Sequence, residues 1–326
     1  MTIVEQTAIT KSQIVKTEIY NTAIHLCIIG GIHILEEYSN CLLCPRKCGV
    51  CRNDNQKGFC GANSICEVSR ISLHYMEEPV ISGPGGSGTV FFSHCTLGCV
   101  YCQNFEISRN NSVGKKYTPK QLAEEYIKLQ NMGANNINFV TPTHYMPSIL
   151  ESCDIARKFG LSIPFVYNTS GFENPEIIEK LKGKIEIFLT DFKYFSPYLS
   201  GLYSKSEDYF DYADSAIDKM VKITGKPKVE NGIMKSGVII RHLMLPGALQ
   251  DTMQVLRHIK KRWDNNVLVS LMRQYTPVCK NLPNELSRTI TEKEYSCAAS
   301  VFEELNLCGF IQGSESVGSD KIPDWN

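Results

Sequence analysis

Residues 94–104 read HCTLGCVYCQN, and their three cysteines, Cys95, Cys99 and Cys102, follow the spacing C-x3-C-x2-C. Thiolates at this spacing can bind three corners of a [4Fe–4S] cluster from a single loop. A cluster with three protein ligands keeps one iron open, and an open metal position can bind a substrate directly. The alternative is an ordinary zinc or buried-thiol site, which the order of elements after Cys102 disfavours.

A regular alternation of strands and helices follows this loop. We expect strands at 89–93, 137–141, 163–167, 185–191, 238–242 and 267–271. We expect helices at 119–132, 146–159, 174–182, 208–224, 248–262 and 291–307. Apolar strands separated by helices predict a parallel sheet covered by helices. The six units predict an α/β fold with a partial (β/α)6 TIM-like barrel, whose polar strand ends share one site.

A second group of cysteines lies upstream, in a segment that we place at 39–75. Its members are Cys41, Cys44, Cys48, Cys51, Cys60 and Cys66. Clustered cysteines in a chain of 326 residues indicate metal ligands, either for zinc or for a second Fe–S cluster. Cys44, Cys48 and Cys51 repeat the C-x3-C-x2-C spacing, but Pro45 interrupts them and no strand–helix alternation follows closely. The later triad is therefore the better candidate for the catalytic cluster.

We divide the rest of the chain into an N-terminal segment, 1–38, expected to be helical, and a barrel domain, 76–326. The sequence of 83–88, GPGGSG, matches G-x-G-x-x-G, yet it precedes a strand rather than opening a helix. We therefore reject the hypothesis that residues 83–88 bind a dinucleotide.

The composition of the chain indicates which classes of partner and which cellular compartment to expect. The net charge is +0 and no long basic run occurs, so we expect no nucleic-acid partner. The apolar run 24–35 is too short to cross a bilayer, and no signal-peptide pattern is evident. With 14 cysteines in such a chain, we expect a reducing cytoplasmic location and no membrane.

Polar residues stand at the carboxyl end of each expected strand. With Tyr101 from the cysteine loop, they are Thr143, His144, Asn168, Thr169, Asp191, Lys193, Arg241 and Gln274. Taken singly, each could be a rim ion pair, a structural charge or a helix cap. Six successive strand ends that carry such groups above one cysteine loop favour a shared binding site.

The chain resembles the radical S-adenosylmethionine (SAM) superfamily. Within it, the chain resembles the pyruvate formate-lyase activating enzyme-like branch and its PflX-like Fe–S subgroup. The cysteine triad carries the superfamily resemblance; branch and subgroup rest on Thr169-Ser170-Gly171-Phe172, Asp191-Phe192-Lys193, Arg241 with Pro246-Gly247, Cys44-Pro45-Arg46, and 138–145, NFVTPTHY.

The resemblance implies a [4Fe–4S] cluster on the triad, with SAM on the fourth iron. It implies that Lys193 and Arg241 help to bind SAM, and that Asn168, Thr169 and Asp191 lie beside a monovalent cation. Lys193 and Arg241 suit the SAM carboxylate. Thr143 and His144 could meet its amine, and Tyr101 its adenine; Gln274 is a further candidate contact.

Three positions depart from the family pattern. The superfamily's Gly-Gly-Glu segment is replaced by Pro142-Thr143-His144, so amine recognition must differ. Asn168 stands where the activating enzymes have Asp, and Cys51 where the subgroup has Asn or Asp. We therefore assign Cys41, Cys44, Cys48 and Cys60 as the ligands of the N-terminal centre, leaving Cys51 and Cys66 spare.

The expected function is reductive cleavage of SAM to a 5′-deoxyadenosyl radical, with activation of a glycyl-radical enzyme as one target. A flavodoxin- or ferredoxin-type protein would supply the electron. The alternatives are radical modification of another peptide, a metabolite or RNA, a non-catalytic Fe–S electron carrier, and a zinc-bearing interaction protein.

Overall fold

The computed structural model describes residues 35–109, 114–316, 318 and 325. The expected N-terminal segment 1–38 therefore lies outside the described residues, apart from its last four. Within the described residues, no helix combines the length and apolarity needed to cross a membrane.

One mixed sheet organises the chain, in the order β10-β9-β8-β6-β5-β4-β2-β1-β3, with β7 paired to β8. Along the order from β10 to β2 the neighbouring strands are parallel, whereas β1 is antiparallel to both β2 and β3, and β7 is antiparallel to β8. The strands are β1 (Cys66–His74), β2 (Ser87–Phe92), β3 (Lys115–Tyr117), β4 (Ile137–Val140), β5 (Phe165–Thr169), β6 (Ile187–Asp191), β7 (Lys228–Glu230), β8 (Ile233–Leu243), β9 (Leu268–Met272) and β10 (Gly309–Ile311). The six expected parallel strands are confirmed as β2, β4, β5, β6, β8 and β9.

Helices connect these strands, as the alternation predicts. They are α2 (Pro79–Ser82), α3 (Phe105–Ser108), α4 (Pro119–Asn131), α5 (Met146–Lys158), α6 (Pro175–Glu179), α7 (Pro197–Ser204), α8 (Tyr209–Thr224), α9 (Leu249–Arg262) and α10 (Glu292–Glu304). The expected start of α4 is confirmed, because Thr118 and Gln121 form a reciprocal capping box before Pro119. The fold is the expected α/β partial barrel.

Two elements differ from the sequence expectation. β1 lies within the expected cysteine-rich segment 39–75, so a boundary after residue 75 separates two paired strands. α7 occupies the Pro/Ser/Tyr-rich stretch between the expected strand 185–191 and the expected helix 208–224, where we expect a loop from the sequence. Its start is nevertheless encoded locally, because the Ser196 side chain accepts from Leu199 N–H and Pro197 opens the helix.

Strand alternation separates an outer, helix-covered face from an inner face. At the amino ends of the strands, the inner face is apolar and packs Val166, Leu189 and Ile239 against Ile81 of α2. Further along the same strands, this face carries Asn168, Asp191 and Arg241 instead. The change from apolar to polar along one face places the charged groups at the carboxyl ends.

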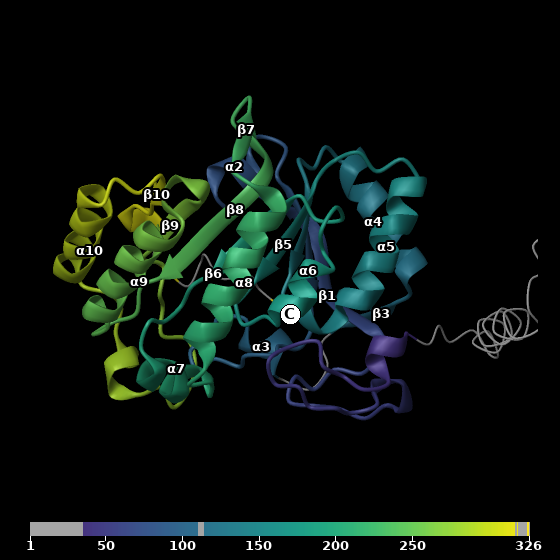
Figure 1. Cartoon of the computed structure of the whole chain (residues 1–326), viewed down its shortest axis with the longest axis horizontal. Helices are drawn as coiled ribbons and strands as arrows, with labels where there is room; N and C mark the ends of the chain where they lie inside the picture. The colour runs from purple at the N-terminus through teal and green to yellow at the C-terminus, as the bar shows by residue number, and fades with distance from the viewer. Residues whose placement is uncertain (1–34, 110–113, 317, 319–324, 326) are drawn as a thin grey trace, which may run out of the picture.

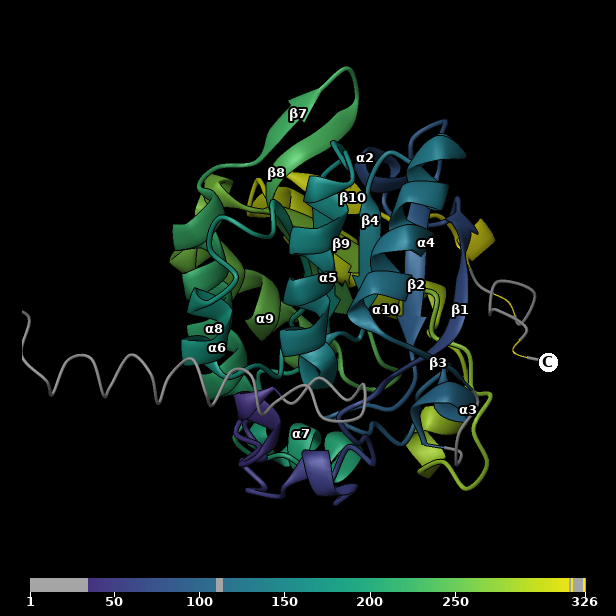
Figure 2. The ribbon, with the colours of Figure 1, turned by 90° about the vertical axis from the view of Figure 1, so that its right-hand side faces the viewer.

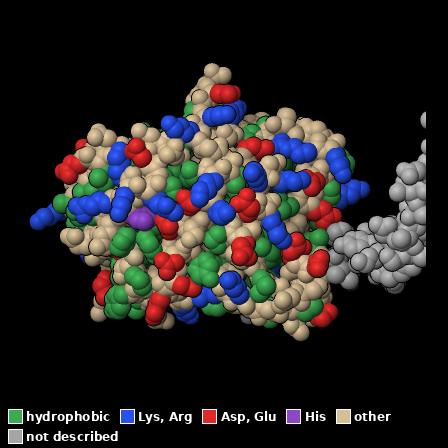
Figure 3. Space-filling model, viewed as in Figure 1, with side chains coloured by type: hydrophobic (Ala, Val, Ile, Leu, Met, Phe, Trp, Pro, Cys, Tyr) green, Lys and Arg blue, Asp and Glu red, His purple; other side chains and the backbone are tan. Residues whose placement is uncertain are grey.

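The cysteine-rich segment, α3 and α7 lie together at one end of the sheet, opposite α2 and the β7–β8 hairpin (Figures 1 and 2). Lysines and arginines interleave with acidic side chains over the visible face, and no field of one sign is evident there (Figure 3).

Candidate active site

The cysteine triad lies in the loop that leaves β2, and each of its sulfurs faces one hydrogen-bond donor. The donors are Leu97 N–H at 3.4 Å from Cys95 Sγ, Ser204 Oγ at 3.0 Å from Cys99 Sγ and Ser108 Oγ at 3.6 Å from Cys102 Sγ. Donors aimed at sulfur suit thiolate ligands, because they stabilise the negative charge that a cluster leaves on them. The donor set therefore fits an Fe–S cluster.

The loop has its shape because Gly98 is a glycine. Its φ of +74° is in the left-handed region, and a Cβ there would lie 1.7 Å from Arg109 Nη2. A side chain would therefore be strained by its backbone and would also displace the guanidinium.

The three thiols influence one another electrostatically. Burial, together with the neighbouring Cys95 and Cys99, raises the pKa of Cys102 to about 12. Burial also raises the pKa of Cys99, but the Lys193 ammonium opposes this rise. Lys193 therefore lies within electrostatic reach of the triad.

Four of the expected binding residues form one largely buried polar network, in which Asp191, Lys193 and Arg241 keep 18%, 13% and 15% of their side chains exposed. Asp191 Oδ1 accepts from Arg241 Nε at 3.0 Å, and Asp191 Oδ2 accepts from Lys193 Nζ at 2.6 Å. Arg241 Nη2 also donates to Asn168 Oδ1 at 2.6 Å. The pairing of Asp191 with Arg241 across β6 and β8 fixes this arrangement. Burial alone would raise the pKa of Asp191, but Lys193 and Arg241 lower it, so the carboxylate stays ionised.

Glu77 completes this network, and the sequence interpretation missed it. Glu77 Oε1 accepts from Asn138 Nδ2 at 3.0 Å, and Oε2 lies 3.4 Å from Arg241 Nη1. Glu77 follows β1, an antiparallel strand that was not expected, so no feature of the sequence placed it inside the barrel. An acidic pair directly before Pro79 at the end of a strand was the available hint.

Thr143 and Thr169 meet at a second carboxyl group that was also missed. Both hydroxyls donate to Glu173 Oε1, and the Thr143 bond measures 2.5 Å. Glu173 is fully buried, and burial raises its pKa to about 7 although Thr143, Thr169 and Tyr167 oppose the shift. Glu173 lies within electrostatic reach of Cys44 in the cysteine-rich segment.

The raised pKa of Glu173 gives a pH prediction. A carboxyl whose pKa is raised by folding stabilises the fold fully when the pH is below its pKa in the unfolded chain, near 4.3. This stabilisation is lost as the pH rises through its pKa in the folded protein, about 7. Glu173→Gln keeps the acceptor and removes the titration. Its free energy of unfolding relative to wild type should therefore rise by about 1–3 kcal/mol between pH 5 and pH 8. Urea unfolding at both pH values checks this, with the exposed Glu176→Gln as control; a constant difference would contradict it.

The remaining expected contacts lie in separate settings. Tyr101 Oη is 2.7 Å from Tyr194 Oη, and Gln274 Oε1 accepts from Gln312 Nε2 at 2.9 Å. His144 is buried, and burial keeps its pKa well below the usual value, so the ring is neutral. Its Nε2–H donates to Ser93 O at 2.7 Å, at the root of the cysteine loop. His144 thus orients the strand that delivers the triad.

The four expected ligands of the N-terminal centre also influence one another. Burial raises the pKa of Cys60. The Arg52 guanidinium opposes this rise, whereas Cys41 and Cys48 add to it. Cys44 behaves alike, with Cys60 and Cys41 among the groups that raise its pKa. Among the described residues, no three cysteine, histidine or acidic side chains gather closely enough to hold a single metal ion.

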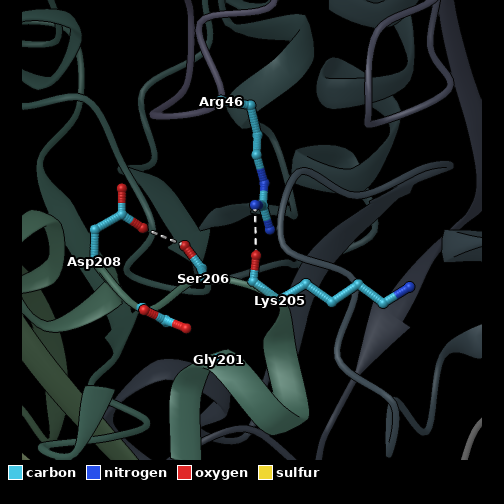
Figure 4. A pocket seen from close by; sticks show the side chains of 6 residues that line it. Arg46, Gly201, Lys205, Ser206 and Asp208 are labelled. Atoms are coloured by element: carbon cyan, nitrogen blue, oxygen red, sulfur yellow. Dashed lines mark hydrogen bonds between the residues drawn. The ribbon is translucent and has the colours of Figure 1, made fainter. Parts of the chain in front are cut away.

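Arg46 fastens this cysteine-rich segment onto the triad loop. Its guanidinium donates to Thr96 O and Leu97 O on the triad loop, and to Ser204 O and Lys205 O at the end of α7. Figure 4 shows the bond from Arg46 to Lys205 O, at a pocket lined by Arg46, Gly201, Lys205, Ser206, Glu207 and Asp208. The guanidinium also lies 4.0 Å from the centre of the Phe59 ring. One side chain therefore links three segments that are distant in sequence.

Replacing Arg46 tests this link. Arg46→Ala should lower the free energy of unfolding by about 2–3 kcal/mol, because hydrogen bonds from a charged group are lost and the carbonyls lose their donor. It should also speed the loss of iron from the protein under a chelator. The exposed Lys57→Ala in the same segment should change stability by less than about 0.5 kcal/mol. Equal stability of the two variants would contradict a clamping role.

Comparison with known proteins identifies a family. The model of the radical SAM superfamily matches residues 89–257. An uncharacterized protein of Methanocaldococcus jannaschii is 33% identical over 283 residues, which cover 83% of this chain and 76% of that protein. A pyruvate formate-lyase-activating enzyme of Staphylococcus epidermidis is 22% identical over 204 residues, which cover 57% of this chain and 72% of that enzyme.

Solved structures with a related chain course include HydG, a maturase of the [FeFe]-hydrogenase. It is 17% identical with a TM-score of 0.49, over 68% of this chain and 49% of that one. SuiB of Streptococcus suis bound to S-adenosylmethionine is 12% identical with a TM-score of 0.43, over 68% of this chain and 46% of that one. This chain spans about half the length of these solved chains.

Proposed function

This chain belongs to the radical SAM superfamily, and we propose that Cys95, Cys99 and Cys102 are the thiolate ligands of the [4Fe–4S] cluster that this superfamily uses together with SAM. When bound, the cluster and SAM supply reductive cleavage of SAM to methionine and a 5′-deoxyadenosyl radical. The observation that carries the proposal is the loop itself, in which three thiols from one strand end each meet a hydrogen-bond donor.

The polar network beside the loop is the proposed SAM-binding surface. An ammonium has three donors and a guanidinium has five, so Lys193 and Arg241 can hold Asp191 and a substrate carboxylate together. Asp191 orients both cations, and Asn168 and Glu77 each contact Arg241. Asn168, Thr169 and Asp191 are also the proposed surroundings of a monovalent cation.

Thr143 and Glu173 are our candidates for the SAM amine, directly or through water, because the acidic residue of the Gly-Gly-Glu segment is missing here. His144 acts through Ser93, and Tyr101 is proposed to place its ring near the adenine. We keep Gln274 as an outer contact on the β9 side of the site.

Anaerobic reconstitution tests the proposed reaction. Protein supplied with iron, sulfide, SAM and dithionite should form 5′-deoxyadenosine and methionine. A flavodoxin or a ferredoxin should replace dithionite as the physiological donor in a reducing cytoplasm. Reconstituted protein that binds iron and sulfide but leaves SAM intact would favour an electron carrier instead.

For the target of the radical, we propose a protein, specifically a glycyl-radical enzyme. The similarity to a pyruvate formate-lyase-activating enzyme supports this choice, as does the PflX-like pattern of motifs. Exposed apolar side chains near the site suit a protein partner, with Phe105 48%, Tyr198 73% and Leu202 44% exposed. Hydrogen abstraction from another peptide, a metabolite or RNA is the alternative. Co-purification of a glycyl-radical enzyme that acquires a radical signal in the presence of this protein would decide for it.

We propose a metal centre at Cys41, Cys44, Cys48 and Cys60, holding either a second Fe–S cluster or zinc, although in the part of the chain that the structure describes no three of these thiols lie close enough together to bind one ion. Gly58 supports this assignment, because a Cβ at that position would lie 2.3 Å from Cys48 Sγ and push the thiol aside. Metal analysis after anaerobic purification distinguishes the occupants, since a second cluster adds about four irons per chain.

A further inference from the structure

Three hydroxyl groups form a hydrogen-bonded row that ends on the sulfur of Cys99. Ser204 Oγ lies 3.0 Å from Cys99 Sγ, and Tyr194 Oη lies 2.7 Å from Ser204 Oγ. Tyr101 Oη lies 2.7 Å from Tyr194 Oη. The row is buried, with Ser204 0%, Tyr194 1% and Tyr101 7% exposed.

The row has a single direction. A hydroxyl carries one hydrogen, so Ser204 cannot donate to both Cys99 and Tyr194. Because Ser204 donates to Cys99, Tyr194 must donate to Ser204, and Tyr101 must donate to Tyr194. Donors arranged head to tail polarise one another, so the bond to sulfur is stronger than one from an isolated serine. Burial raises the pKa of both tyrosines well above the usual value, so both keep their protons.

The support of Ser204 is fixed in place. Ser204 is the last residue of α7, and the preceding carbonyl, Tyr203 O, accepts from Val100 N–H of the triad loop at 2.8 Å. Arg46 holds the carbonyl of Ser204 itself at 3.2 Å. The donor and the sulfur are therefore bound to each other through the backbone as well as through the side chain.

The shortest of the three donor–sulfur distances is the one to Cys99 Sγ. Its donor is 3.0 Å away, whereas the donors to Cys95 and Cys102 are 3.4 Å and 3.6 Å away. The three corners of the triad are thus not equivalent, and the buried hydroxyl row acts on one of them.

We propose that Ser204, with Tyr194 and Tyr101 behind it as positioning residues, raises the reduction potential of the cluster that Cys99 helps to bind. This inference rests on the proposed function only in assigning Cys99 to the cluster. A donor to a ligating sulfur withdraws electron density and stabilises the reduced cluster, which carries the extra negative charge. The row therefore makes the cluster easier to reduce by a biological donor.

The test is a redox titration followed by electron paramagnetic resonance, on reconstituted protein without SAM. The signal to follow is the one that Cys99→Ala removes. Ser204→Ala should shift its midpoint to a more negative potential. Tyr194→Phe should shift it less in the same direction, and Tyr101→Phe least. Ser204→Thr keeps the donor and should restore the wild-type midpoint.

Ser108→Ala is the matched control, because it removes a hydroxyl that lies 3.6 Å from Cys102 Sγ and should shift the midpoint less than Ser204→Ala. An unchanged or more positive midpoint in Ser204→Ala, at wild-type iron content, overturns the inference. If Ser204→Ala does not retain the cluster, Tyr194→Phe decides: a negative shift supports the row and no shift overturns it. If Cys99→Ala leaves the whole spectrum and the iron content unchanged, that result would instead reject the ligand assignment of the proposed function.

Discussion

Replacing Cys99 by alanine should reduce 5′-deoxyadenosine formation to the level measured without protein. Cys99 lies in the middle of the triad, with Ser204 beside its sulfur and Lys193 within electrostatic reach. With only two thiolates left in the loop, the cluster loses one of the corners that hold it and the free energy that its binding contributes to the fold. Chromatographic assay of 5′-deoxyadenosine after anaerobic reconstitution measures the loss, and iron analysis should show about four irons fewer per chain.

Two alanine variants make this result specific. Cys297→Ala removes an exposed thiol on α10 and should leave the activity unchanged. Cys51→Ala removes a member of the competing C-x3-C-x2-C triad that is not in our N-terminal ligand set, so it should also remain active. Activity in Cys99→Ala together with its loss in Cys51→Ala would move the catalytic cluster to Cys44, Cys48 and Cys51.

Asp191→Asn should lower the free energy of unfolding by about 3–5 kcal/mol at pH 7, because removing one partner of a buried ion pair leaves the other charges uncompensated. Asp191 pairs with both Arg241 and Lys193, so the substitution leaves two largely buried cations, of which Arg241 keeps a contact with Glu77. Burial raises the pKa of Glu77, which weakens it as a substitute. SAM affinity should fall as well, because both cations lose the partner that orients them.

The pH dependence identifies the cause. The pKa of Asp191 is lower in the folded protein than in the unfolded chain. The ionised carboxylate therefore stabilises the fold at any pH above the unfolded-state pKa, and this stabilisation is lost as the pH falls through the folded-state pKa. The difference between wild type and Asp191→Asn should therefore be full at pH 7 and shrink only below about pH 4. Asp214→Asn is the control, since its cationic partner Arg262 is 45% exposed and lies 3.4 Å away, so the expected loss is about 1 kcal/mol or less. Equal losses in the two variants, or no loss in Asp191→Asn, would contradict a buried network at this site.

The sequence predicts the parallel strands well because their apolar runs and helix-starting residues are local. Thr118 with Pro119 and Gln121 is one example, and the structure confirms it as a capping box. The parallel order then requires Asn168, Asp191 and Arg241 to share one end of the sheet, and they do form a network.

What the sequence interpretation missed depends on contacts between distant segments. Glu77 lies beside Arg241 because β1 is antiparallel to β2 and because α2, which follows Glu77 closely, packs on the inner face of the sheet. Glu173 meets Thr143 because β4 and β5 are neighbours, and no local pattern indicates that pairing. Ser204 is the last residue of α7, a helix that the sequence did not predict because the stretch is rich in Pro, Ser and Tyr. Its hydroxyl nevertheless makes the shortest hydrogen bond to a sulfur of the triad.

The central claim is that the triad holds a cluster with an open iron that binds SAM. Its most direct test is the electron paramagnetic resonance spectrum of the reduced protein, recorded with and without SAM. The account predicts that SAM changes the signal that Cys99→Ala removes, because SAM would bind at the open iron of that cluster. A spectrum of that cluster unchanged by saturating SAM would contradict it.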